Sequence, residues 1–103
     1  MYKLGVYIPD SHLEPVKLAL FEAGAGRIGN YDCCCWQTAG KGQFRPVEGS
    51  TPYIGRQGEV ETVAEYRVEL VCNDDCIRQV LAALHASHPY EEPAFDVVRM
   101  EDF

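Results

Sequence analysis

The feature that most constrains the fold is a strict alternation of side chains along residues 59–70. One set of alternate positions is largely apolar and comprises Val60, Thr62, Ala64, Tyr66, Val68 and Leu70. The other set is largely charged and comprises Glu59, Glu61, Val63, Glu65, Arg67 and Glu69. A period of two is typical of a β-strand that buries one face and exposes the other. The segment therefore predicts a long strand of an antiparallel sheet.

The N-terminal segment predicts a strand over residues 2–8 followed by a helix. Apolar side chains recur at the spacing of one helix face, at Leu13, Val16, Leu20 and Phe21. The start of the helix has two readings, because Ser11 and Glu14 form a capping box while Pro15 suits the first helical position. Gly24 predicts its end, since glycine adopts the left-handed conformation of a helix C-terminus at low cost.

The remaining elements follow from the same patterns. Residues 31–38 predict a second strand, and residues 73–75 (Asn-Asp-Asp) predict the cap of a second helix. The apolar face of that helix comprises Ile77, Val80, Leu81 and Leu84. The helix must end before His88, which precedes a proline. Residues 94–100 predict the last strand.

The resulting order is strand, helix, strand, strand, helix, strand. We therefore expect one α+β domain over residues 1–103, with a ferredoxin-like βαββαβ fold. Two helices would cover one face of a four-stranded antiparallel sheet, and right-handed crossovers would place the first and third strands in the centre.

The sheet face without helices carries apolar side chains. Tyr7, Val63 and Val71 lie opposite the main apolar set of their strands, and the last strand is apolar on both faces. A sheet that is apolar on both sides usually packs against another surface. We expect this face to mediate self-association.

Composition excludes several classes of function. The 103 residues include 9 Lys and Arg against 16 Asp and Glu, a net charge of −7, which disfavours nucleic acid as a partner. No segment is long and apolar enough to span a membrane, and no targeting segment is visible. The five cysteines are odd in number and three are adjacent, a pattern that favours reduced thiols and a cytoplasmic protein.

Two glycine-rich segments lie between the predicted elements. Residues 24–29 match G-x-G-x-x-G, but they follow a helix and precede a strand, which is the reverse of a dinucleotide fingerprint. A helix cap and turn is the better interpretation. Residues 39–58 form a connection longer than a hairpin needs. Its candidate ligand or interface residues are Lys41, Phe44, Arg45, Tyr53 and Arg56. The segment either holds an anion or acidic partner, or folds back and packs on a neighbouring subunit, the interpretation that we favour.

The segment 88–93 (His-Pro-Tyr-Glu-Glu-Pro) holds the other candidates. His88, Glu91 and Glu92 can serve as metal ligands or as an acid/base pair, although a rigid turn on which Tyr90 packs is the more common structure. Metal sites usually need three or four ligands.

The cysteines offer a second metal hypothesis. Cys33 and Cys35 would share one face of the strand predicted over residues 31–38, and Cys72 would lie on its partner, so the three thiols can approach a soft metal ion. The alternative is that they are small core residues. No nucleophile signature of the Ser/His/Asp or Cys/His type stands out.

Three stretches together resemble a known family: residues 23–31, residues 44–49 with 52–55, and residues 88–96. They are similar to the domain inserted into bacterial Nif-three-like proteins, which also occurs as a free-standing small protein. That domain resembles the trimeric PII and CutA proteins, and the resemblance implies a ferredoxin-like fold and a homotrimer. The metal ligands of the larger family lie in a flanking core that has no counterpart in this sequence, so the resemblance implies no hydrolase-like activity here.

We therefore expect a non-enzymatic, cytoplasmic homo-oligomer that acts as a regulatory or scaffolding module. A small ligand or protein partner would bind at clefts between subunits, with no required cofactor and no nucleic-acid or membrane partner. The alternative is a CutA-like protein that binds divalent or soft metal ions.

Overall fold

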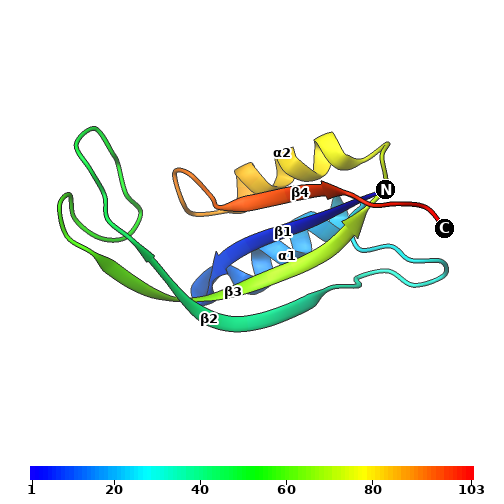
Figure 1. Ribbon diagram of the computed structural model, residues 1–103, viewed down its shortest axis with the longest axis horizontal. Coiled ribbons are helices and arrows are strands. Elements are labelled where there is room, and N and C mark those ends of the chain that lie inside the picture. Colours follow the sequence, from blue (N-terminus) through cyan, green and yellow to red (C-terminus); the bar gives the residue numbers. More distant parts are fainter.

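The computed structural model describes residues 1–103 and confirms the predicted α+β fold (Figure 1). Its elements in chain order are β1 (Tyr2–Pro9), the short 3-10 helix η1 (Asp10–His12), α1 (Leu13–Glu22), β2 (Trp36–Phe44), β3 (Glu61–Cys72), α2 (Ile77–Ser87) and β4 (Phe95–Arg99). The four strands form one antiparallel sheet in the order β2-β3-β1-β4. The first and third strands are therefore central, as expected. No helix of the structure is long and apolar enough to cross a membrane.

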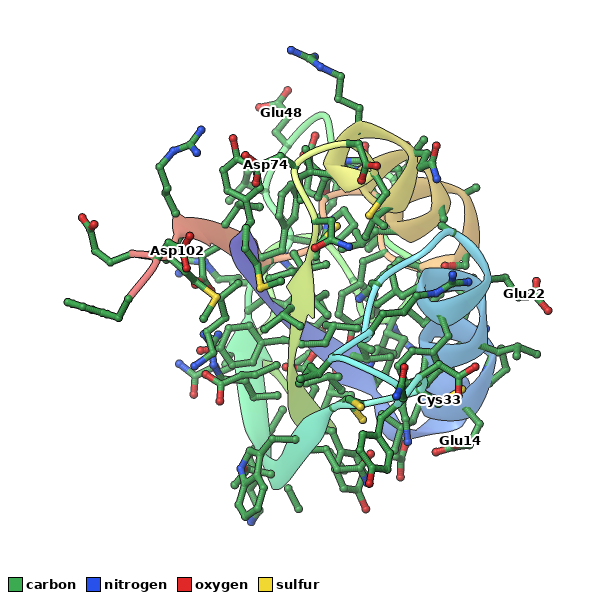
Figure 2. All side chains as sticks on the ribbon, turned by 90° about the vertical axis from the view of Figure 1, so that its right-hand side faces the viewer. Glu14, Glu22, Cys33, Glu48, Asp74 and Asp102 are labelled. Atoms are coloured by element: carbon green, nitrogen blue, oxygen red, sulfur yellow. The ribbon has the colours of Figure 1, made fainter.

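Both helices lie on one face of the sheet and bury the core against it (Figure 2). The core contains residues from β1, β3, α1 and α2: Leu4, Val6, Ile8, Val68, Leu70, Leu13, Val16, Leu20, Val80 and Leu84, with Ala25, Cys72 and Cys76 beside them. Figure 2 shows Glu14 and Glu22 of α1 pointing away from the sheet. The apolar stripes predicted from the sequence are thus the surfaces that the helices bury.

Helix α1 ends where the glycine predicts, but it begins differently from the capping-box reading. Gly24 has a φ of +114°, and the Ala25 N–H donates to the Leu20 carbonyl at 3.1 Å. At the other end, the Ser11 hydroxyl bonds the His12 ring instead of a helix N–H, and Pro15 is the third helical residue. The 3-10 helix η1 leads the chain into α1, so no side-chain cap forms.

Helix α2 also lacks the predicted side-chain cap. A backbone turn begins it instead, in which the Cys76 N–H donates to the Asn73 carbonyl at 3.1 Å. The Asp74 carboxylate lies 3.7 Å from the Arg99 guanidinium. The helix ends at Ser87, before His88 and its proline, as predicted.

The second strand was predicted too early. Residues 31–35 form a loop, and β2 begins at Trp36. Cys33 has a φ of +55°, which a strand does not allow, and the Cys34 N–H donates to the Gly26 carbonyl at 2.9 Å. This segment bonds the glycine loop after α1, so its backbone groups are not available for a strand ladder. Cys33 and Cys35 therefore do not share a strand face, and the β2–β3 connection is residues 45–60 instead of 39–58.

The sheet face without helices carries the expected apolar side chains, together with charged ones. Tyr7, Trp36 and Val98 are exposed, but Arg67 occupies the centre of the face. The Arg67 guanidinium donates to Asp96 at 3.1 Å and to Glu69 at 3.3 Å, and it lies 5.1 Å from the centre of the Tyr7 ring. It also lies flat against Gly5, where a side chain would collide with it. We call this surface the open face.

Candidate functional site

A cavity of about 500 Å³ lies at one end of the sheet. Residues 45–54 of the β2–β3 connection form one wall, and residues 90–94 of the α2–β4 connection form another. Figure 1 shows both connections at the same end of the sheet, opposite the two chain termini. The β2–β3 hairpin extends past the helices there, which gives the molecule its long axis of 46 Å.

The floor of the cavity is part of the open face. Where β2 pairs with β3, Gly42 lies opposite Val63 and Gly40 lies opposite Glu65. Where β1 pairs with β3, Pro9 lies opposite Glu65. Because paired residues in antiparallel strands point to the same face, Gly42, Phe44, Glu65 and Tyr7 all lie on the side away from the helices. The cavity therefore lies on the open face, at its loop-covered end.

Glu65 and Tyr90 form the best-defined polar contact of the cavity. The Tyr90 hydroxyl donates to Glu65 Oε2 at 2.9 Å, and the Glu65 side chain is only 9% exposed. Burial and the bond to the carboxylate raise the pKa of Tyr90, which keeps its hydroxyl protonated as a donor. Gly42 makes room for the Glu65 carboxylate, because any side chain at position 42 would overlap it.

His88 supports Tyr90 from outside the cavity. Its Nε2 lies 2.7 Å from the Tyr7 carbonyl, and its Nδ1 accepts the Tyr90 N–H at 3.1 Å. These two bonds fix the neutral tautomer with the proton on Nε2. Burial lowers the pKa of His88 below its ordinary value, with the Tyr7 carbonyl and Glu65 opposing that shift. Both ring nitrogens are occupied, so His88 has none free for a metal ion.

The two loops that wall the cavity are held by hydrogen bonds. The Thr51 N–H donates to Glu91 Oε2 at 2.9 Å and so joins one loop to the other. The Gly58 N–H donates to the Pro46 carbonyl at 2.7 Å and closes the base of the β2–β3 connection. The Tyr53 ring packs edge-on against His12 of η1 at 5.5 Å. This connection is therefore a folded structure with its own contacts.

The structure brings most of the candidate residues together. Those that line the cavity are Phe44, Arg45, Tyr53, Tyr90, Glu91 and Glu92. Lys41 and Arg56 do not line it, and His88 lies behind Tyr90. The sequence reasoning missed Tyr7 and Glu65 as members of the site. Their signal was present in the strand alternation, which places both on the open face.

The cysteines are arranged differently from the predicted set. The Cys72 and Cys76 sulfurs lie 3.2 Å apart and both residues are buried, whereas Cys33 is exposed in the loop before β2. Burial and the bond to Cys76 raise the pKa of Cys72 to about 12. Nowhere do three or more His, Cys, Asp or Glu side chains gather as metal ligands would.

Comparison with known proteins places the chain among larger relatives. No family model matches it. The chain is 51% identical over 92 residues to a Mycobacterium leprae protein named GTP cyclohydrolase 1 type 2 homolog, a match that covers 89% of this chain and 24% of the relative. It superposes on the structure of a Bacillus cereus protein related to NIF3 with a TM-score of 0.83 and 40% identity, over 98% of this chain and 26% of that one.

The chain is homologous to one segment of Nif-three-like proteins. It spans about a quarter of the length of the relatives it matches. The fold is also that of CutA: the Xylella fastidiosa protein superposes with a TM-score of 0.69 and 21% identity, over 99% of this chain and 85% of that one. The resemblance stated from the sequence motifs is thereby confirmed, and the CutA comparison supports the fold alone.

Proposed function

We propose that the chain is a non-enzymatic, ligand-binding module of a homo-oligomer, with its ligand in the cavity between residues 45–54 and 90–94. The observation that carries the proposal is the convergence of aromatic and carboxylate side chains on a space of about 500 Å³. This volume lies within the range of small-molecule sites in proteins, which are mostly apolar with a few placed polar groups.

The open face supports the oligomeric part of the proposal. Trp36 is 69% exposed there, and Tyr7 and Val98 are also accessible to solvent. Large apolar side chains gathered on one face of a sheet are typical of an interface. The cavity lies at the end of the same face, so a neighbouring subunit would approach its rim. The likeness to CutA and PII proteins favours a trimer, in which such cavities become clefts between subunits.

The chemistry of the cavity supports binding more than catalysis. The raised pKa of Tyr90 keeps its hydroxyl protonated at neutral pH, so no phenolate is available as a base, and that proton is already donated to Glu65. Glu91 is engaged with the Thr51 N–H. The bonds of Tyr90 and Glu91 thus shape the cavity. This favours a regulatory or scaffolding role.

The test is a thermal-shift screen of a metabolite library, combined with light scattering. We expect a trimer mass and at least one compound that raises the melting temperature. Tyr53→Ala should abolish that shift, since Tyr53 lines the cavity. Tyr31→Ala is the matched control, because Tyr31 is exposed and lies outside the cavity. A one-chain mass and shifts that Tyr53→Ala leaves unchanged would contradict the proposal.

One observation favours a second candidate, soft-metal binding. The Cys72 and Cys76 sulfurs are 3.2 Å apart, and copper(I) takes thiolate pairs as ligands; its binding would displace the proton that the raised pKa keeps on Cys72. One of the CutA structures with this fold is that of a periplasmic divalent cation tolerance protein from Archaeoglobus fulgidus. Elemental analysis of untagged protein tests this candidate. Stoichiometric copper or zinc that is lost in Cys72→Ser but kept in Cys33→Ser would support it, and metal-free protein after copper(I) loading would exclude it.

A further inference from the structure

We propose that the cavity binds an organic cation, a protonated amine or quaternary ammonium group, with its charge against Glu65 and the neighbouring aromatic rings. This inference rests on the proposed function and names the chemical class of its ligand.

Glu65 is the first support for this inference. Its side chain is nine-tenths buried and lines the cavity, yet it forms no ion pair. The Tyr90 hydroxyl bonds Oε2 only, and no protein donor reaches Oε1. No buried side-chain oxygen lacks a hydrogen-bond partner in the structure, so Oε1 is accessible from the cavity, where a ligand could reach it. The nearest cation on its strand, Arg67, already bonds Asp96 and Glu69. Glu65 therefore presents an uncompensated negative charge to the cavity.

The second support is the aromatic wall. Phe44 and Tyr90 lie with ring centres 5.9 Å apart and tilted by 54°, and Tyr53 faces the same space from the β2–β3 connection. The negative face of an aromatic ring attracts ammonium groups, and several rings around one space form the cages that bind quaternary ammonium ligands. Arg67 already lies over one face of the Tyr7 ring, 5.1 Å from its centre.

The charge balance of the lining selects against anions. Three carboxylates line the cavity, those of Glu65, Glu91 and Glu92, against the single guanidinium of Arg45. The bond from the Thr51 N–H occupies one oxygen of Glu91 and leaves its charge in place. An anionic ligand would meet a net negative wall, whereas a cation would gain from both the carboxylates and the rings.

Calorimetric titration with matched probes tests the proposal. The cations are choline and butylammonium, the neutral analogues are 3,3-dimethylbutan-1-ol and butan-1-ol, and the anion is butyrate. We expect a cation to bind at least about tenfold more tightly than its neutral analogue, and butyrate not to bind. Glu65→Gln keeps the shape and removes the charge, so it should abolish that preference. Glu61→Gln is the matched control on the same face of β3, outside the cavity, and should preserve it.

A second variant keeps the test decisive if Glu65→Gln does not fold. Tyr53→Leu keeps an apolar side chain at an exposed position and removes one ring, so choline binding should weaken by about tenfold. If the neutral analogues bind as tightly as the cations and Tyr53→Leu weakens their binding, the ligand is not a cation. The proposed function would then remain intact, because the cavity still binds a ligand. Binding of butyrate alone would have the same meaning. No binding of any probe at millimolar concentration, together with a failed library screen, would overturn both.

Discussion

The hydrogen bond from Tyr90 to Glu65 places a donor against a carboxylate that has little contact with water. Tyr90→Phe removes this donor and leaves the ring in place. We expect a loss of about 1–3 kcal/mol in the free energy of unfolding, because a buried charged acceptor then has no protein partner. Urea denaturation measures the change. Tyr31→Phe removes a hydroxyl from an exposed ring and should change the free energy by less than about 0.5 kcal/mol.

His88 makes stability depend on pH. Its pKa in the folded protein is lowered by burial, so the unfolded chain binds a proton first as pH falls. The contribution of His88 to stability is therefore complete above the ordinary histidine pKa of about 6.5 and is lost as pH falls from there toward the lower folded-state value. Urea denaturation at pH 5 to 8 should show this loss.

Two variants separate His88 from the other histidines. His88→Gln can still donate to the Tyr7 carbonyl, but it does not titrate, so the fall in stability below pH 6.5 should diminish. The exposed His85 packs edge-on against Phe95, and His85→Gln should leave the fall unchanged. A pH dependence that survives His88→Gln would contradict this role.

At the scale of the elements, the end of α1 depends on a glycine. Gly24 has a φ of +114°, and a Cβ there would lie 3.3 Å from the Cys76 side chain. Gly24→Ala should destabilise the fold by about 1–3 kcal/mol, through backbone strain and this contact. Thermal denaturation measures the loss. Gly40→Ala is the control, since Gly40 in β2 has no positive φ and has open space around it, and it should be nearly neutral.

Most elements could be predicted from the sequence because their periodicity reports which face is buried. The alternation along residues 59–70, which predicts β3, and the apolar stripes of both helices depend on local spacing, and the structure confirms them. The start of β2 could not be predicted this way. Residues 31–35 have strand-like composition, but the Cys34 N–H donates to the Gly26 carbonyl in the loop after α1, a contact that composition does not report.

The site was predictable only in part for a related reason. Loop residues such as Tyr53 and Glu91 could be predicted as candidates because their segments are unusual in length or composition. Glu65 could not, since a glutamate in an alternating strand is ordinarily exposed to solvent. Its burial results from Gly42 on one side and the Tyr90 loop on the other, which come together only in the folded sheet.

In the whole molecule, the open face is the surface that we propose as the contact between subunits. Val98 lies on this face in β4, and its side chain is 54% exposed. Val98→Lys should dissociate the assembly, because three copies would bring unpaired charges into an apolar contact. Light scattering measures the mass. Val60→Lys, at a similarly exposed position outside the strands, should leave it unchanged. A wild-type mass of one chain at micromolar concentration would contradict the assembly.

Residues 45–54 and 90–94 enclose the cavity on the open face in which we propose that the ligand binds. An NMR titration of ¹⁵N-labelled protein with choline tests this location, because it reports the position of binding residue by residue. We predict amide shifts concentrated at residues 42–54, Glu65 and residues 90–94, with α1 and α2 unaffected. Shifts centred on the helices, or none up to saturation of the probe, would contradict the account.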